Sequence, residues 1–212
     1  GGIAYTALSD LGWELKEIWN THAHPDHIRG NEKLASLTGA KIMQNFMDEK
    51  RDFENGIYQK LTLAIPGHSM DHVGYLFLKN NKQEFFFCAD TLFQAGVGHC
   101  RLGGDVATLY QTIGELNENI EDSTLLYTGH DYLINNLEFA LTIDGDNQEI
   151  KKMLKKARTQ DSFLLTNMAQ ERKINPFLRL FTDEFKEAFT IAEKNMNNES
   201  LFFHLRALRD NW

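Results

Sequence analysis

One short segment constrains this chain more than any other: residues 21–27 read THAHPDH, three histidines and an aspartate within seven positions. Imidazole nitrogens and carboxylate oxygens are ligands for zinc and iron-like cations, and ligands this close in sequence converge only from a tight turn or loop. A polar surface turn would also accept these residues, but the chain has only 8 histidines in 212 residues. The segment therefore predicts a metal site.

The composition excludes several classes of protein. A net charge of −8 argues against a nucleic-acid partner, and 42% hydrophobic residues suit one large domain or a domain with a smaller appendage. No run approaches the ~18 consecutive apolar residues of a membrane span, and residues 1–10 lack the features of a signal peptide. Two cysteines, Cys88 and Cys100, cannot make a disulfide framework. We expect a cytoplasmic protein without membrane partners, and a monomer is favoured.

Strand and helix patterns alternate in the first two thirds of the chain. Strand patterns cover residues 14–20, 41–44, 61–65, 73–78, 84–88 and 123–127. Helix patterns cover residues 3–10, 31–38 and 108–116, and later 135–141, 148–157, 182–195 and 200–208. The change in composition near residues 144–146 predicts a boundary between an α/β part at 1–143 and a helical part at 144–212.

Ligand-type residues follow the ends of four predicted strands, which is how α/β folds present their sites. The candidates are His22, His24, Asp26, His27, His68, Asp90 and His130. Seven side chains are too many for one tetrahedral ion, whereas two metals that share a bridging carboxylate and a bridging hydroxide would use them all. Because a two-metal site lowers the pKa of bound water and stabilises charge on oxygen, the candidates predict hydrolysis.

These motifs occur in the order typical of the metallo-β-lactamase superfamily, which the chain resembles. The motifs are THAHPDH at 21–27, PGH at 66–68, ADT at 89–91 and GH at 129–130. Residues 90–98, 127–140 and 205–212 further resemble glyoxalase II, the hydroxyacylglutathione hydrolases, so the similarity covers nearly the whole chain. It implies a metallo-β-lactamase-like αββα sandwich as the catalytic domain, residues 1–143, with a C-terminal helical substrate-binding domain, residues 144–212. Only twenty residues precede Thr21, so we expect the N-terminal strands of that sandwich to be missing.

The resemblance also implies a division of the ligands between two divalent metal ions. His22, His24 and His68 would hold one ion, and Asp26, His27 and His130 would hold the other, with Asp90 bridging. Zinc is favoured, with iron or manganese as alternatives. A metal-bridging hydroxide would cleave S-D-lactoylglutathione, or a related 2-hydroxyacylglutathione, to the hydroxy acid and glutathione, with Asp26 and Asp90 as catalytic residues. His72 is not a ligand in the family, and we expect it to support its neighbours.

Substrate contacts are implied by the same resemblance. Tyr132 resembles the family's tyrosine near the glutathione backbone, and Arg206 and Arg209 resemble a basic pair that meets the glycine carboxylate. The family usually has a lysine or arginine where this chain has His99, followed by an aromatic pair. We therefore expect a weaker carboxylate anchor at His99, or one that passes to Arg101.

Two alternatives remain open. A persulfide dioxygenase-like enzyme would share the fold but use one iron held by two histidines and an aspartate, and such enzymes tend to lack the Asn135-Asn136-Leu137 run and the long helical tail. A non-enzymatic metal-binding scaffold is the second alternative, although no candidate ligand is lost. Metal content and chelator-sensitive thioester hydrolysis distinguish the three.

Overall fold

The computed structural model describes residues 1–43, 50–53, 56–160, 162–186, 188–189 and 195–212. Its main element is a six-stranded sheet in the order β10-β9-β6-β5-β4-β3. The strands are β3 (Lys50–Phe53), β4 (Tyr58–Ala64), β5 (Val73–Lys79), β6 (Lys82–Ala89), β9 (Leu125–Thr128) and β10 (Thr166–Asn167). Neighbouring strands are antiparallel except for the parallel pair β6 and β9. As a result β4, β6 and β9 all run in the same direction.

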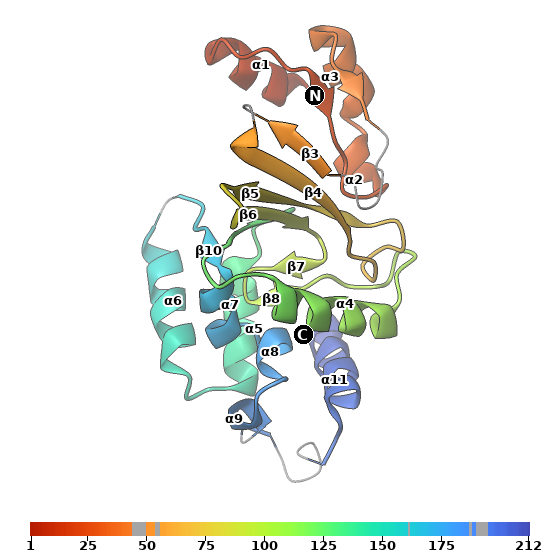
Figure 1. Cartoon of the computed structure of the whole chain (residues 1–212). Helices are drawn as coiled ribbons and strands as arrows, with labels where there is room; N and C mark the ends of the chain where they lie inside the picture. The colour runs from red at the N-terminus through yellow and green to blue at the C-terminus, as the bar shows by residue number, and fades with distance from the viewer. Residues whose placement is uncertain (44–49, 54–55, 161, 187, 190–194) are drawn as a thin grey trace.

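A smaller unit stands on one side of this sheet. β1 (Glu17–Ile18) and β2 (Lys41–Ile42) pair in parallel, and they connect with α1 (Gly2–Asp10), α2 (Pro25–Ile28) and α3 (Asn31–Thr38). Figure 1 shows α1 and α3 at one end of the molecule, the strands in the middle and the remaining helices at the other end. The layering agrees with the mixed α/β fold that the sequence predicts.

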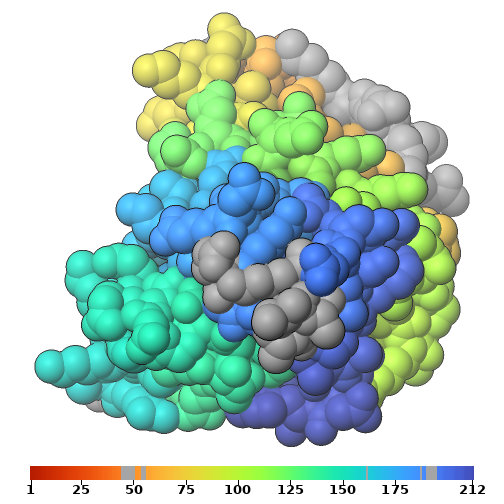
Figure 2. Space-filling view, turned by 90° about the horizontal axis from the view of Figure 1, so that it is seen from below, coloured from red at the N-terminus to blue at the C-terminus, as the bar shows by residue number. Residues whose placement is uncertain are grey.

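The remaining helices cover the opposite side. They are α4 (Val106–Asn119), α5 (Leu133–Ile143), α6 (Gln148–Thr159), α7 (Met168–Ile174), α8 (Pro176–Arg179), α9 (Asp183–Lys186) and α11 (Asn198–Asn211). Seen from that end, the teal residues of α5 and α6 lie directly against the blue C-terminal residues (Figure 2). None of the described helices is both long and apolar enough to cross a membrane.

The β5–β6 hairpin shows why these residues form a half-covered sheet. Side chains alternate along a strand, so Phe86 and Cys88 are fully buried in the core while Phe87 on the other face is 37% exposed. Asn80 and Asn81 make the connection with φ angles of 50° and 64°, as a two-residue hairpin turn requires. The sequence predicts this hairpin, with a longer connection at residues 79–83.

The C-terminal segment packs into the same core as the sheet. Phe177 and Phe202 belong to the buried cluster that also contains Phe86 and Leu109. β10, which the sequence does not predict, adds residues 166–167 to the edge of the sheet. The domain division at 143/144 stays a prediction. Residue 44 of the predicted strand at 41–44 lies outside the described residues, as do residues 187 and 190–194 of the predicted helix at 182–195.

Candidate metal centre and substrate pocket

The candidate ligands gather at one edge of the six-stranded sheet. Since β4, β6 and β9 run in the same direction, their C-terminal ends meet at that edge. His68 follows β4, Asp90 follows β6 and His130 follows β9. The segment at 21–27 reaches the same place from the end of β1. The topology therefore brings together residues that are spread over more than half of the chain.

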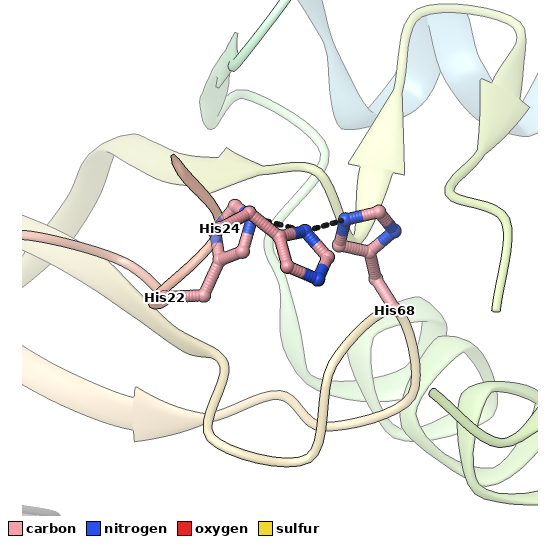
Figure 3. Close-up of side chains that lie close together, drawn as sticks. All are labelled: His22, His24 and His68. Atoms are coloured by element: carbon pink, nitrogen blue, oxygen red, sulfur yellow. Dashed lines mark hydrogen bonds between the residues drawn. The ribbon is translucent and has the colours of Figure 1, made fainter. Parts of the chain in front are cut away.

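Three histidines form the first cluster, with His24 lying between His22 and His68 (Figure 3). Nδ1 of His24 is 3.1 Å from Nε2 of His22 and 3.0 Å from Nε2 of His68. Ligand atoms on one tetrahedral zinc ion lie about 3.3 Å apart when each bond is about 2.0–2.1 Å long. The three nitrogens therefore have the spacing of three ligands to one cation.

Asp26, His27 and His130 form a second cluster whose ligand atoms also lie within reach of one ion. Oδ2 of Asp26 is 3.4 Å from Nε2 of His130 and 3.8 Å from Nε2 of His27. The Asp26 side chain is 51% exposed, so this cluster faces solvent more than the first. Both sets of three that the family resemblance assigns to separate ions are thus assembled in the structure.

A single oxygen of Asp90 lies between the two clusters. Its Oδ2 atom is 3.6 Å from Nε2 of His68 in the first cluster. The same atom is 3.4 Å from Nε2 of His27 and 3.5 Å from Nε2 of His130 in the second. A carboxylate that bridges two cations must face both ligand sets in this way.

Gly129 makes room for this carboxylate. A Cβ atom at position 129 would lie 2.0 Å from Oδ1 of Asp90 and 3.0 Å from Cε1 of His27, so no larger residue fits without moving the site. Ala89, which precedes the aspartate, has a φ angle of 40° in the left-handed region that non-glycine residues rarely adopt. The backbone at the end of β6 is therefore bent so that Asp90 points into the centre.

Hydrogen bonds on the far side of each imidazole fix which nitrogen is available to a cation. Nδ1 of His68 donates to the carbonyl of His99 at 2.7 Å, and Nε2 of His24 donates to the carbonyl of Leu102 at 2.9 Å. Nδ1 of His22 is 3.1 Å from the hydroxyl of Thr21. The nitrogens left over are those that converge in the first cluster, an arrangement that orients metal-bound histidines in general.

The electrostatics of the first cluster and of Asp90 favour the protonation states that bind metal, whereas Asp90 raises the pKa of His27 in the second cluster. Burial lowers the pKa of His22 to about 4 and also lowers that of His68, so both rings are neutral near pH 7. Burial on its own would raise the pKa of Asp90, but the adjacent His27 and the other histidines hold it below its usual value. Neutral imidazole and ionised carboxylate are the ligand forms of these groups.

Two buried atoms in the centre lack hydrogen-bond partners among the described residues: Nε2 of His27 and Oδ1 of Asp90. Leaving such groups unpaired inside a protein is costly, and most native structures avoid it. A cation in the second cluster would satisfy the His27 nitrogen directly. The residues present therefore fit a pair of bound metal ions.

His72 supports the first cluster without joining it. The side chain is fully buried and stacks on His22 with a centroid distance of 4.5 Å and an interplanar angle of 17°. It belongs to none of the described groups whose ligand atoms converge. That His72 is not a ligand stays a prediction.

A cavity of about 470 Å³ adjoins the metal centre. Its walls include the five predicted substrate contacts, which are His99, Arg101, Tyr132, Arg206 and Arg209. The Tyr132 ring stacks on His130 at a centroid distance of 5.4 Å and an angle of 24°. The carbonyl of His99 accepts a hydrogen bond from His68, so residues of the cavity wall contact a ligand of each cluster.

The arginines of the cavity differ in how far the protein already uses their donors. Arg206 is buried and donates to the carbonyls of Val97 and Gly98, at 2.9 and 3.3 Å, and to the Asp210 carboxylate. Arg101 has a side chain that is 58% exposed, and of its guanidinium nitrogens only Nη2 has partners among the described residues, both on Asp210. Of these two arginines, Arg101 is the one with more unused donors.

Two other groups set the charge of the cavity. Arg209 donates to the side-chain oxygens of Asn135 and Asn136, and its guanidinium lies 5.3 Å from the Trp212 ring centroid. Burial lowers the pKa of His99, with Arg206 and Arg101 adding to the effect, so this imidazole is neutral near pH 7. The guanidinium groups, and not His99, supply the positive charge.

Several lining residues were not predicted as contacts, among them Phe93, Asp210 and Trp212. Phe93 meets the Tyr132 ring edge-on at 5.2 Å. Asp210 stands four positions after Arg206 on α11, so the helical spacing alone could have indicated that ion pair. No comparable spacing in the sequence indicates Phe93 or Trp212, because a single aromatic residue ordinarily predicts a position in the hydrophobic core.

Family models match the two ends of the chain. The model described as hydroxyacylglutathione hydrolase C-terminus matches residues 131–212, and that of the metallo-beta-lactamase superfamily matches residues 3–45. The crystal structure of ETHE1 from Myxococcus xanthus has a TM-score of 0.61 at 22% identity, over 98% of this chain and 82% of that one. This similarity shows the metallo-β-lactamase fold.

Two other relatives have a higher sequence identity to this chain. Proteins named hydroxyacylglutathione hydrolase from Nitrosococcus oceani and from a Polaromonas species are each 33% identical to this chain. Each alignment covers 95% of this chain and 83% of the relative. The chain belongs to the hydroxyacylglutathione hydrolase family of the metallo-β-lactamase superfamily.

Proposed function

We propose that this protein hydrolyses S-D-lactoylglutathione, or a related 2-hydroxyacylglutathione, to the hydroxy acid and glutathione. The observation that carries the proposal is the position of Asp90, whose Oδ2 atom is 3.6 Å from His68 and 3.4 Å from His27. One carboxylate thus faces two ligand sets beside an arginine-lined cavity. The name of the relatives supports a glutathione thioester as the substrate.

The cofactor in this proposal is a pair of divalent metal ions, with zinc favoured and iron or manganese as alternatives. His22, His24 and His68 would hold one ion, and Asp26, His27 and His130 the other, with Asp90 between them. When bound, such a pair lowers the pKa of water and stabilises the negative charge that develops on a carbonyl oxygen. The protein supplies ligands whose tautomers are already fixed by the carbonyls of His99 and Leu102.

The cavity would bind the glutathione part of the substrate. Arg101 and Arg209 are suited to its carboxylates, because a guanidinium can pair with a carboxylate through two parallel hydrogen bonds. Arg206 lines the same wall from a buried position. Tyr132 stacks on His130, so a thioester lying along this ring would have its carbonyl next to the metal centre. Water then replaces the thiol at the carbonyl carbon, and the C–S bond breaks.

The two alternatives make different demands on the centre. A mononuclear iron dioxygenase needs two histidines and one aspartate, whereas seven ligand-type side chains converge here. A scaffold that only binds metal would have no use for a cationic cavity next to the ligands. Both observations favour hydrolysis.

A kinetic panel tests the proposal. Purified protein is assayed on a series of glutathione thioesters with and without chelator, and metal content is measured on the same sample. His24→Ala should abolish turnover and lower the metal content, whereas His204→Ala on α11, outside the centre, should change neither. Metal-independent turnover, or none on any thioester, contradicts the proposal; one iron per chain with persulfide-dependent oxygen uptake supports the dioxygenase. A monomeric state and a cytoplasmic location stay predictions.

A further inference from the structure

The turn between β7 (Leu92–Phe93) and β8 (Gly96–Val97) forms one wall of the substrate cavity. Phe93 and Val97 line the cavity on either side of this turn. The carbonyl of Gln94 accepts a 2.9 Å hydrogen bond from the side chain of Asn136 on α5. A short turn of this kind has few backbone bonds of its own, so its conformation depends on such side chains.

Asn175, the N-cap of α8, adds two more bonds to the turn. Its amide nitrogen donates to the carbonyl of Gly96 at 3.0 Å and to that of Phe93 at 3.3 Å. In Figure 1 the helices α7 and α8 lie next to β8, although Asn175 is 79 positions from Gly96 in the chain. A residue of the helical part of the molecule therefore stabilises the backbone of this cavity wall.

The shortest of these hydrogen bonds is made with Glu171 on α7. Its Oε2 atom accepts the N–H of Ala95 at 2.7 Å. Ala95 has a φ angle of 55°, a left-handed conformation that is strained for a non-glycine residue. The hydrogen bond to Glu171 thus stabilises Ala95 in a conformation that it would otherwise leave.

Burying the carboxyl group of Glu171 at this position costs free energy, which argues for a role beyond packing. The side chain is fully buried, and the groups that face it among the described residues, on Ala95, Asn175 and Thr166, are neutral. Burial raises its pKa to about 7. A buried carboxyl group without a cation is unfavourable, and an apolar side chain of the same size would fill the space at lower cost. The hydrogen bond to Ala95 is what that side chain could not provide.

We propose that Glu171 is a positioning residue for substrate binding: by accepting the Ala95 N–H it holds the β7–β8 turn, and with it Phe93 and Val97, in the shape that receives the glutathione part of the substrate. The inference rests on the proposed function for the identity of that substrate. Glu171 touches neither the cavity nor the metal ligands. Its removal should therefore weaken binding and leave the chemical step intact.

Three variants test this. Glu171→Met keeps the volume of the side chain but cannot accept the N–H, while Glu171→Gln keeps an acceptor oxygen. KM and kcat are measured with S-D-lactoylglutathione, the Kd of glutathione by calorimetry, and metal content on the same samples. We expect Glu171→Met to raise KM and Kd about tenfold, with kcat within about threefold and the metal content unchanged, and Glu171→Gln to resemble the wild type.

A rescue experiment separates positioning from general stability. Glycine adopts a positive φ without strain, so Ala95→Gly in the Glu171→Met background should restore KM to within about threefold of the wild type. Should Glu171→Met not fold, Glu171→Asp withdraws the oxygen from Ala95 and gives the same comparison. If Glu171→Met has a lowered Tm but unchanged KM and Kd, the inference about Glu171 is wrong, while the proposed function is unaffected. Wild-type protein that neither hydrolyses a glutathione thioester nor binds glutathione would overturn the proposed function as well.

Discussion

Nδ1 of His68 donates a 2.7 Å hydrogen bond to the backbone carbonyl of His99, and this bond joins a candidate metal ligand to the wall of the substrate cavity. The bond fixes the His68 tautomer, so that Nε2 points to His24 and Asp90. It also ties residue 99 to the metal centre, next to the carbonyls that Arg206 holds. In the proposed function, substrate binding and catalysis would therefore depend on the same backbone segment, residues 97–99.

Asp90→Asn tests the bridging carboxylate. The substitution keeps the shape of the side chain but removes the charge that faces His27, His68 and His130. Metal content should fall below two ions per chain, and kcat/KM should fall by more than ~100-fold, because even residues that only orient ligands cost about 10–100-fold. Elemental analysis and thioester hydrolysis measure both. Full metal content with near wild-type activity would rule out the bridge.

Gly129→Ala tests the space that the carboxylate needs. The added Cβ would lie 2.0 Å from Oδ1 of Asp90, so the variant should lose metal and activity while remaining folded by circular dichroism. Gly114→Ala on α4 is the matched control, because its Cβ would lie an ordinary 3.5 Å from the Phe181 ring. The control should keep activity and gain roughly 0.5–1 kcal/mol of stability, as alanine does in a helix. Equal losses in both variants would contradict this explanation.

Glu171 gives the stability of the protein a defined dependence on pH. Its pKa rises from an ordinary 4.5 to about 7 on folding, so the folded state binds the proton more tightly than the unfolded state. The associated stabilisation is complete below about pH 4.5 and is lost as pH rises through about 7. Glu171→Gln lacks this loss, so its free energy of unfolding should exceed that of the wild type by up to about 3 kcal/mol at pH 8.

Urea titrations of the wild type and Glu171→Gln at pH 5 and pH 8 measure this difference. Comparing two proteins that share every other titrating group cancels the contribution of the metal ligands. A stability difference that is the same at both pH values, or larger at pH 5, would show that burial does not raise the pKa of this carboxyl group.

Arg101→Gln tests the anchor for a substrate carboxylate. Its guanidinium is largely exposed and has unused donors, so losing it should raise KM for glutathione thioesters about tenfold with little change in kcat or Tm. Arg206→Ala should differ by lowering Tm, because it breaks buried bonds to Val97, Gly98 and Asp210. Arg158→Gln, which removes an exposed ion pair with Glu138 on the helices, is the control. An unchanged KM in Arg101→Gln would exclude this role.

The candidate ligands and the fold class were predictable from sequence because short-range spacing encodes both. The ligand motifs at 21–27, 66–68, 89–91 and 129–130 each follow a strand pattern, and parallel strand ends meet at one edge of the sheet. The division of the ligands into two clusters came from the family resemblance. No local rule in the sequence indicates which imidazole nitrogen faces the metal, since the fixing carbonyls come from residues 99 and 102.

What the sequence did not indicate are short elements and long-range bonds. β7, β8 and β10 have two residues each, too few for a periodic pattern. The hydrogen bond from Ala95 to Glu171 joins residues 76 positions apart. A glutamate on a helix ordinarily predicts a solvent-facing position. The burial of Arg206 was equally hidden, because an arginine on a terminal helix predicts a solvated face.

The central claim is that two metal ions act together in thioester hydrolysis. The measurement that tests it most directly is the rate of S-D-lactoylglutathione hydrolysis by metal-free protein as zinc is added. The arrangement of two ligand clusters around Asp90 predicts a rate that rises until about two equivalents per chain are bound. A rate that reaches its plateau at one equivalent, or no hydrolysis with both sites filled, would contradict the claim.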